Sequence, residues 1–265
     1  EDSVIHAAPL SHGSGLYALP HIAKAANNII PESGGFKPEE ILTLIPKFKG
    51  VTIFGAPTMI VRLMNSPQIE DADTDNLKLL YYGGAPMYVE DVKQALLKFG
   101  PKLVQIYGQG EAPMTISYLS RDFYADTSHP NYVERIASTG IARTDVEFKV
   151  VDEFDNEVPH GVAGEVTVRG DVVMTGYWED EEATESALRG GWLHTGDIGS
   201  VDEDGFLTLL DRSKDMIISG GTNIYPREVE EILLQHEHVH EVSVIGRPHK
   251  EWGEEVVAFV ICNKK

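Results

Sequence analysis

Residues 39–84 read EEILTLIPKFKGVTIFGAPTMIVRLMNSPQIEDADTDNLKLLYYGG, and they alternate helix-like with strand-like segments. Apolar residues recur at helical spacing in 39–48 and in 57–64, where a proline stands at the predicted helix start. The short apolar run at 51–54 separates these two helices, and the same alternation continues to residue 108. Strands that alternate with amphipathic helices are typical of parallel strands joined by crossovers. The stretch therefore predicts an α/β fold with a parallel sheet.

A different pattern begins near residue 138, where short strand-like runs separated by turn residues replace most helices. These runs are VEFKVVD (146–152), GEVTVRG (164–170), WLHTGD (192–197) and FLTLLD (206–211). EDG at 203–205 is a hairpin signal. The acidic run WEDEEATE at 178–185 is expected at the solvated start of a helix. We therefore expect an antiparallel β subdomain here.

After Asp211 the pattern is mixed again, with a strand MIIS at 216–219, a glycine turn and a helix from Pro226. This pattern predicts the start of a small α+β domain. The predicted boundaries are 1–137 for the α/β part of a large domain, 138–211 for its β subdomain and 212–265 for the beginning of a mobile C-terminal α+β domain.

The charge balance excludes some partners. The 265 residues include 42 acidic and 22 basic ones, which gives a formal charge of -20. Such a chain repels nucleic acid and anionic lipid. No apolar stretch approaches the roughly 20 residues that a membrane-spanning helix needs. The single cysteine, Cys262, lies in an apolar run and is expected to be buried, and we predict a cytoplasmic protein.

Several longer motifs occur in one order along nearly the whole chain. They are PLSHGSG (9–15), YYGGAPM (81–87), YGQGEAP (107–113), STGIARTDVEFKVVD (138–152), GEVTVRGDVVMTGYWEDEEAT (164–184) and WLHTGDIGSVDEDGFLTLLDRSKDMIISGGTNIYPREVEEIL (192–233). In this order they resemble the adenylate-forming, AMP-binding superfamily, which includes acyl-CoA synthetases, aryl-CoA ligases, firefly luciferase and peptide-synthetase adenylation domains. Any one motif alone would be a weak signal.

The resemblance implies an acid:thiol ligase of the fatty acyl-CoA or aryl-CoA type. A carboxylate is a poor electrophile, so its oxygen first attacks the α-phosphate of ATP to give an acyl-adenylate. The thiol of CoA then displaces AMP. The implied cofactors are ATP/AMP, Mg²⁺ and CoA, with a carboxylic acid as substrate in fatty acid metabolism. Positioning and charge neutralisation carry most of the catalysis in such phosphoryl chemistry.

The motif YGQGE is implied to contact the nucleotide and the metal. By resemblance Glu111 is the Mg²⁺ ligand, and carboxylate oxygen suits a hard cation. The residues implied to bind cofactor beside it are Tyr107, Gly108, Gln109 and Gly110. The superfamily usually has Thr or Ser in place of Gly110, so a hydroxyl contact to the α-phosphate is missing here. Taken without the other motifs, Glu111 is an ordinary loop residue.

Three residues farther along are implied to hold AMP or to move the C-terminal domain. Asp197 is implied to accept hydrogen bonds from the ribose hydroxyls, and Arg212 to contact ribose or phosphate. Lys214 is implied to be the hinge at which the second domain rotates between adenylation and thiolation. The ordinary alternatives are a turn-forming aspartate, a surface ion pair of Arg212 with a neighbouring aspartate, and an exposed lysine in a polar turn.

Two glycine pairs and one histidine complete the implied site. Gly83 and Gly84, with Ala85, resemble the adenine-binding turn, where backbone without Cβ atoms lies flat against a base. Gly220 and Gly221 resemble the segment that lines the pantetheine channel, although either pair could be an ordinary turn. His12 is implied to flank the acyl carboxylate, and the absence of an acidic residue in 9–15 argues against an amino acid substrate.

The resemblance also implies elements that this sequence does not contain. The superfamily's phosphate loop is expected before residue 1 and its catalytic lysine after residue 265, so the chain alone is expected to adenylate poorly. Two alternatives stay open: transfer to the phosphopantetheine of a carrier protein, and a non-catalytic chain that binds a nucleotide or a partner. Firefly-type oxygenation is a further variant. The sequence indicates neither the acid nor the oligomeric state.

Overall fold

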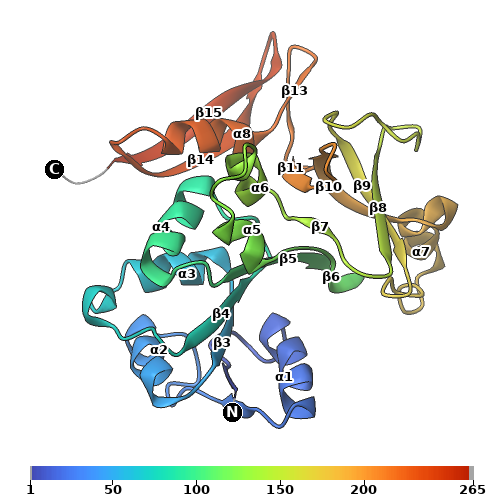
Figure 1. The fold of residues 1–265 in the computed structure, drawn as a ribbon. Helices are drawn as coiled ribbons and strands as arrows, with labels where there is room; N and C mark the ends of the chain where they lie inside the picture. The colour runs from blue at the N-terminus through green and yellow to red at the C-terminus, as the bar shows by residue number, and fades with distance from the viewer. Residues whose placement is uncertain (1, 263–265) are drawn as a thin grey trace. The chain divides into compact units, whose positions relative to one another are not determined.

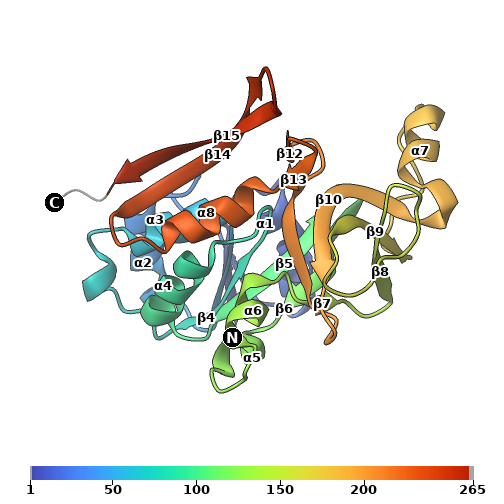
Figure 2. The same cartoon turned by 90° about the horizontal axis from the view of Figure 1, so that it is seen from above.

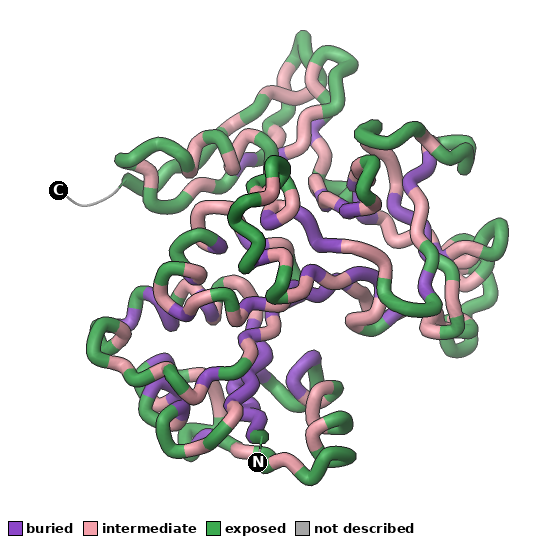
Figure 3. Tube along the Cα trace, in the orientation of Figure 1, coloured by how far each residue is buried: buried purple, intermediate pink, exposed green. Residues whose placement is uncertain are grey.

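A computed structural model describes residues 2–262 of the chain (Figure 1). The backbone contacts divide the chain into two compact units, Glu1–Ile141 and Ala142–Lys265. Buried positions concentrate on the strands, whereas helix surfaces and loops are exposed (Figure 3). Among residues 2–262 no helix is both long and apolar enough to cross a membrane.

The first unit is built on a sheet with the strand order β2-β1-β3-β4-β5-β6-β7. Its strands are β1 (Ser3–Ile5), β2 (Asn27–Ile29), β3 (Val51–Gly55), β4 (Leu77–Tyr82), β5 (Leu103–Gln109), β6 (Ala112–Leu119) and β7 (Ile141–Ala142). Neighbours from β2 to β5 pair in parallel, and β5 pairs with β6 in antiparallel fashion. The predicted parallel sheet is therefore confirmed.

Helices cover both faces of this sheet. They are α1 (Gly13–Ala23), α2 (Pro38–Leu44), α3 (Pro57–Met64), α4 (Val89–Phe99), α5 (Arg121–Ala125) and α6 (Tyr132–Ala137). In Figure 1 α2, α3 and α4 lie on one side of β3 and β4, and α1 lies on the other. All five residues of β3 are buried, as expected for a parallel strand covered on both faces.

Local sequence explains where these helices begin and end. Pro38 and Pro57 occupy the first positions of α2 and α3, where the missing backbone N–H costs nothing. Gly100 ends α4 with a φ of 74°, a conformation that glycine adopts without strain. Between the elements, the core includes fully buried Ile53 and Leu80, each of which contributes about 1.5–3 kcal/mol by leaving water.

The second unit contains two antiparallel sheets (Figure 2). The first has the order β11-β10-β9-β8 and consists of β8 (Val146–Val151), β9 (Gly164–Gly170), β10 (Leu193–Val201) and β11 (Leu207–Arg212). The turn between β10 and β11 contains residues 203–205, which confirms the predicted hairpin. Helix α7 (Glu181–Ala187) begins after Asp180, whose Oδ1 accepts from the N–H of Ala183 at 3.0 Å, so the helix start expected in 178–185 is also confirmed.

The second sheet of this unit has the order β13-β12-β15-β14. It consists of β12 (Ile217–Ser219), β13 (Thr222–Ile224), β14 (Val239–His249) and β15 (Gly253–Cys262), with helix α8 (Pro226–Leu234). Glu230 on α8 accepts from the backbone N–H of Val244 on β14 at 2.8 Å, which ties the helix to the sheet. The expected helix from Pro226 is present, in a mixed α+β arrangement.

One expectation for this sheet is wrong. Cys262 was expected to be buried because it lies in an apolar run, but its side chain is exposed. The last five residues of β15 are all exposed, so the described chain covers neither face of this strand end. An apolar run predicts a strand, but it does not predict what packs against the strand.

Candidate functional site

A cavity of about 440 Å³ lies at the carboxyl ends of the parallel strands of the first unit. Ligands of open α/β sheets bind at this edge, because the loops that follow the strands meet there. The lining is mainly glycine and apolar side chains and consists of Leu10, Ser11, His12, Gly13, Gly15, Leu16, Gly83, Gly84, Ile106, Gly108, Gln109, Gly110, Pro113 and Met114. This lining contains no acidic side chain, and it brings together six of the residues that the sequence indicated.

Close backbone packing explains two of the lining glycines. A Cβ on Gly83 would lie 2.7 Å from the carbonyl oxygen of Ile106, and one on Gly108 would lie 2.2 Å from the backbone N of Met114. Neither contact is possible for a real side chain, because both partners are backbone atoms. Gly84 is exposed and has a φ of 88°, so its conformation also favours glycine.

The pair Gly110–Glu111 forms the turn between β5 and β6, since Gln109 and Ala112 are paired across it. A Cβ on Gly110 would meet no atom within 4 Å, so packing does not require glycine at this position. Glu111 directly follows Gly110, a residue of the cavity lining, in the sequence. Mg²⁺ binds through one or two carboxylates together with water and substrate phosphates. Among residues 2–262 no group of three or more His, Cys, Asp or Glu side chains is arranged to hold a metal ion by itself.

His12 and Met114 both belong to the cavity lining. His12 immediately precedes α1, is exposed, and its Nδ1 lies 3.0 Å from the Ser11 hydroxyl. Met114 has a φ of 55°, which is uncommon for a residue with a side chain. Two residues implied to bind nucleotide are outside this lining: Tyr107 is buried within β5, and Ala85 is exposed after Gly84.

Asp197 lies in β10 of the second unit, directly opposite Arg212 of β11. Asp197 is only 9% exposed, and its Oδ1 lies 3.7 Å from Nε of Arg212. The Arg212 side chain is 61% exposed, so it is much more accessible to solvent than the Asp197 side chain. Beside them, burial raises the pKa of the Asp211 carboxyl above its ordinary value of 3.8. A carboxylate held next to a guanidinium suits recognition of neighbouring hydroxyls and an anion.

A bulge in β10 presents Asp197. His194 pairs with Thr167 and Ile198 with Glu165, so 195–197 on β10 face only one residue of β9. Here the Thr195 hydroxyl donates to the carbonyl oxygen of Val166 at 2.7 Å. Bulges re-aim side chains next to functional sites.

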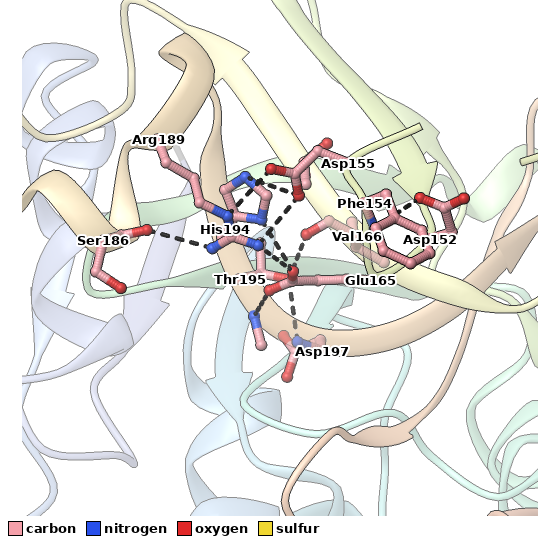
Figure 4. Close-up of polar contacts among 12 residues, drawn as sticks. Asp152, Phe154, Asp155, Glu165, Val166, Ser186, Arg189, His194, Thr195 and Asp197 are labelled. Atoms are coloured by element: carbon pink, nitrogen blue, oxygen red, sulfur yellow. Dashed lines mark hydrogen bonds and ion pairs between the residues drawn. The ribbon is translucent and has the colours of Figure 1, made fainter. Parts of the chain in front are cut away.

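A charged network lies beside this bulge and consists of Asp155, Glu165, Arg189 and His194 (Figure 4). The motifs indicated no role for these four residues. Glu165 accepts from the backbone N–H of Gly196 at 3.0 Å, and His194 Nδ1 and Arg189 contact its other oxygen at 2.9 and 3.2 Å. Arg189 also donates to both oxygens of Asp155 at 3.2 Å. These hydrogen bonds hold the pKa of Asp155 below its ordinary value of 3.8. The sequence held one signal, the juxtaposition of His194 and Asp197 in one motif.

The remaining candidates lie elsewhere in the second unit. Lys214 is exposed in the turn between β11 and β12. Gly220 and Gly221 form the two-residue hairpin turn between β12 and β13, with φ of 58° and 82°. Two positive φ values in a two-residue hairpin are typical of a type I′ turn. A Cβ on Gly220 would also lie 2.7 Å from the Trp252 ring, so this pair has a local structural reason to be glycine.

The comparison with known proteins agrees with this geometry. Residues 1–178 match the family described as AMP-binding enzyme, and residues 228–265 match the AMP-binding enzyme C-terminal domain. The chain is 35% identical over 253 residues to a medium/long-chain-fatty-acid–CoA ligase of Mycobacterium tuberculosis, covering 96% of this chain and 43% of the relative. The chain thus spans about half the length of the curated relatives it matches.

Solved structures give the same result. The amide bond synthetase McbA from Marinactinospora thermotolerans is 34% identical and matches with a TM-score of 0.89, covering 99% of this chain and 52% of that one. O-succinylbenzoate coenzyme A synthetase from Bacillus subtilis, in complex with AMP, is 31% identical with a TM-score of 0.82, covering 100% of this chain and 52% of that one. The chain belongs to the AMP-binding enzyme family.

Proposed function

We propose that the full-length protein activates a carboxylic acid with ATP and transfers the acyl group to the thiol of CoA. In the first step a carboxylate oxygen bonds to the α-phosphorus, and the bond to the leaving pyrophosphate breaks. In the second step the thiolate attacks the acyl carbon and AMP leaves. The observation that supports the proposal best is the glycine-lined cavity at the carboxyl edge of the parallel sheet.

The residues of this cavity are assigned roles that their geometry permits. Gly83 and Gly84, followed by Ala85, offer backbone to the adenine, because no side chain separates it from the base. The loop of Gln109 and Gly110 is proposed to contact the phosphates, and its position in the cavity lining supports this role. The preceding Tyr107 and Gly108 support this loop, Tyr107 from its buried position in β5 and Gly108 through its tight packing against Met114.

Glu111 is the residue of this edge that would hold Mg²⁺, since the metal needs a carboxylate oxygen and takes its other ligands from phosphate and water. When bound, the metal neutralises negative charge on the phosphates. Glu111 itself would supply one carboxylate ligand from the β5–β6 turn. The pairing of Gln109 with Ala112 fixes the position of this turn.

In the second unit Asp197 is proposed to accept hydrogen bonds from the ribose hydroxyls, and Arg212 to contact ribose or phosphate. The low exposure of Asp197 supports a fixed acceptor. Lys214 is proposed as the hinge between 138–211 and the C-terminal domain, and the turn of Gly220 and Gly221 as a wall of the pantetheine channel. The exposed position of Lys214 in a turn between two sheets supports the hinge role.

The acid is proposed to be apolar and to carry no ammonium group. His12 borders the cavity, and the rest of its wall includes Leu10, Leu16, Ile106 and Met114. An ammonium group needs an acidic partner when it leaves water, and this lining contains none. Fatty and aryl acids both lack an ammonium group, and a medium/long-chain-fatty-acid–CoA ligase is among the relatives.

The test is acid-dependent exchange of labelled pyrophosphate into ATP, with the full-length protein and a panel of fatty, aryl and amino acids. We expect exchange with an apolar acid and none with amino acids. Adding CoA, a phosphopantetheine carrier protein or an amine to separate reactions then identifies the acceptor by the product formed, and we expect the thioester of CoA. A folded protein that exchanges pyrophosphate with no acid would contradict the proposal and favour a chain that only binds nucleotide.

A further inference from the structure

The backbone of Gly196 is held by hydrogen bonds at both its N–H and its carbonyl oxygen. Its N–H donates to Oε1 of Glu165 at 3.0 Å, and its carbonyl oxygen accepts from the N–H of Ser213 at 2.9 Å. Gly196 has a φ of 69°, so the chain turns sharply there. Gly196 directly precedes Asp197 and Ser213 directly follows Arg212, so these two hydrogen bonds restrain the backbone beside both side chains.

Glu165 is itself held in place. Its carboxylate can only accept hydrogen bonds, so Nδ1 of His194 must donate to Oε2 at 2.9 Å. Arg189 donates to the same oxygen at 3.2 Å and is anchored through both oxygens of Asp155. The side chains of His194 and Glu165 are 5% and 22% exposed. Charge-assisted hydrogen bonds with so little access to water are stronger than those on an open surface.

The bulge explains why such a support is needed. Residues 195–197 depart from the regular pairing with β9, so on that side the strand ladder does not hold Asp197, which is paired only with Arg212 of β11. The hydroxyl of Thr195 donates to the carbonyl oxygen of Val166 and accepts from the N–H of Asp197 at 3.1 Å. The side chain of Glu165 accepts from the N–H of Gly196, in the preceding peptide group of the bulge.

We propose that Glu165, braced by His194 and Arg189, is a positioning residue that holds the Gly196 peptide so that Asp197 is preorganised to bind the hydroxyls of a ribose. This inference rests on the ribose-binding role proposed above for Asp197. Glu165 does not touch the nucleotide in this scheme. Its effect is on the selectivity for a ribose over a deoxyribose, because only a correctly directed carboxylate distinguishes the two.

The experiment measures binding of AMP, 2′-deoxy-AMP and 3′-deoxy-AMP to the full-length protein by isothermal titration calorimetry. A hydrogen bond to a charged acceptor predicts that AMP binds about 10- to 100-fold more tightly than the deoxy analogues. In Glu165→Gln one oxygen becomes an NH₂ group, so the side chain cannot accept from both Gly196 and His194. We expect this variant to lose about tenfold of the discrimination while the fold is retained.

Glu147→Gln is the matched control. Glu147 lies on β8 of the same sheet and pairs with Arg169 at 2.6 Å, so the substitution makes the same change of charge without touching residues 193–197. It is expected to keep the full preference for AMP. Circular dichroism and thermal melts confirm that each variant is folded. If Glu165→Gln does not fold, His194→Ala tests the same link, with a loss of discrimination in the same direction.

Asp197→Ala distinguishes the ribose-binding role of Asp197 from the positioning role of Glu165. If Asp197→Ala abolishes the discrimination but folded Glu165→Gln retains it, the positioning role is refuted and the ribose role stands. If Asp197→Ala retains the discrimination, the ribose role is refuted and the positioning role with it. Equal losses in Glu147→Gln and Glu165→Gln would also overturn the inference, because a general effect of charge would then explain both.

Discussion

Gly110→Thr is expected to improve ATP use. The superfamily resemblance implies Thr or Ser at this position, and the structure has room for a Cβ there. A Cβ on Gly110 would meet no atom within 4 Å, and the φ of Gly110 is not among the positive ones. The Cβ of the new side chain therefore meets no clash, and the position, which lies in the cavity lining, does not require a left-handed backbone.

The magnitude follows from the strength of one hydrogen bond to a charged acceptor. Such a bond contributes about 1.5–3 kcal/mol, and each 1.4 kcal/mol corresponds to about a tenfold change in affinity. Restricting a β-branched side chain in a turn costs part of this gain. We therefore expect kcat/KM for ATP to rise by about tenfold in pyrophosphate exchange, with the free energy of unfolding changed by less than about 1 kcal/mol.

Gly110→Val provides the control, because valine has the shape of threonine without the hydroxyl. It is expected to match Gly110→Thr in stability and to lack the gain in activity. By contrast, Gly108→Ala should destabilise the protein by about 1–3 kcal/mol or more, since its Cβ would lie 2.2 Å from the backbone N of Met114. A folded Gly110→Thr variant whose kcat/KM equals that of Gly110→Val would refute the placement of Gly110 at the phosphates.

Further predictions concern stability. Tyr82→Phe should lower the free energy of unfolding by about 1–3 kcal/mol in urea titrations, because buried Gln105 and Tyr124 lose their partner. Burial raises the pKa of Tyr124 well above 10.0, so stability should fall as the pH rises above about 10, where only the unfolded chain ionises this group. Hydrogen bonding to Arg189 lowers the pKa of Asp155 below 3.8. Its stabilising contribution is present above that pH and lost below it, and melts of Arg189→Ala should show a weaker acid dependence.

Much of the fold could be predicted because its signals are local. The alternation in 39–84 indicated parallel strands, and β3 is buried at every position as such a strand requires. The hairpin at 203–205 and the start of α7 also follow from short-range turn and capping chemistry. The exposure of Cys262 could not be predicted in this way, since it depends on which segments cover β15.

In the candidate site, too, the sequence indicated the features that depend on local motifs but not those that depend on packing. Motifs indicated Gly83, Gly108 and Gly110 equally, yet a Cβ is excluded at the first two and tolerated at the third. Only the packing of neighbouring strands distinguishes these cases. Glu165 was quoted within a motif but given no role, because its contact with Gly196 depends on the bulge in β10. Strand register is a non-local property that residue types do not reveal.

The contrast between Asp197 and Arg212 shows how one strand pair can serve two demands. The Asp197 side chain is 12% exposed and follows Gly196, whose N–H and carbonyl oxygen are both hydrogen-bonded, which fits the proposed role of a fixed acceptor for hydroxyl groups. Arg212 is 61% exposed, and its long side chain can follow a ligand that moves. A fixed acceptor confers selectivity because reorienting it costs free energy, whereas a mobile cation contributes attraction that varies little with ligand geometry. In the proposed scheme Glu165 restrains the backbone beside Asp197 at the bulge, whereas the exposed side chain of Arg212 can adjust to the ligand.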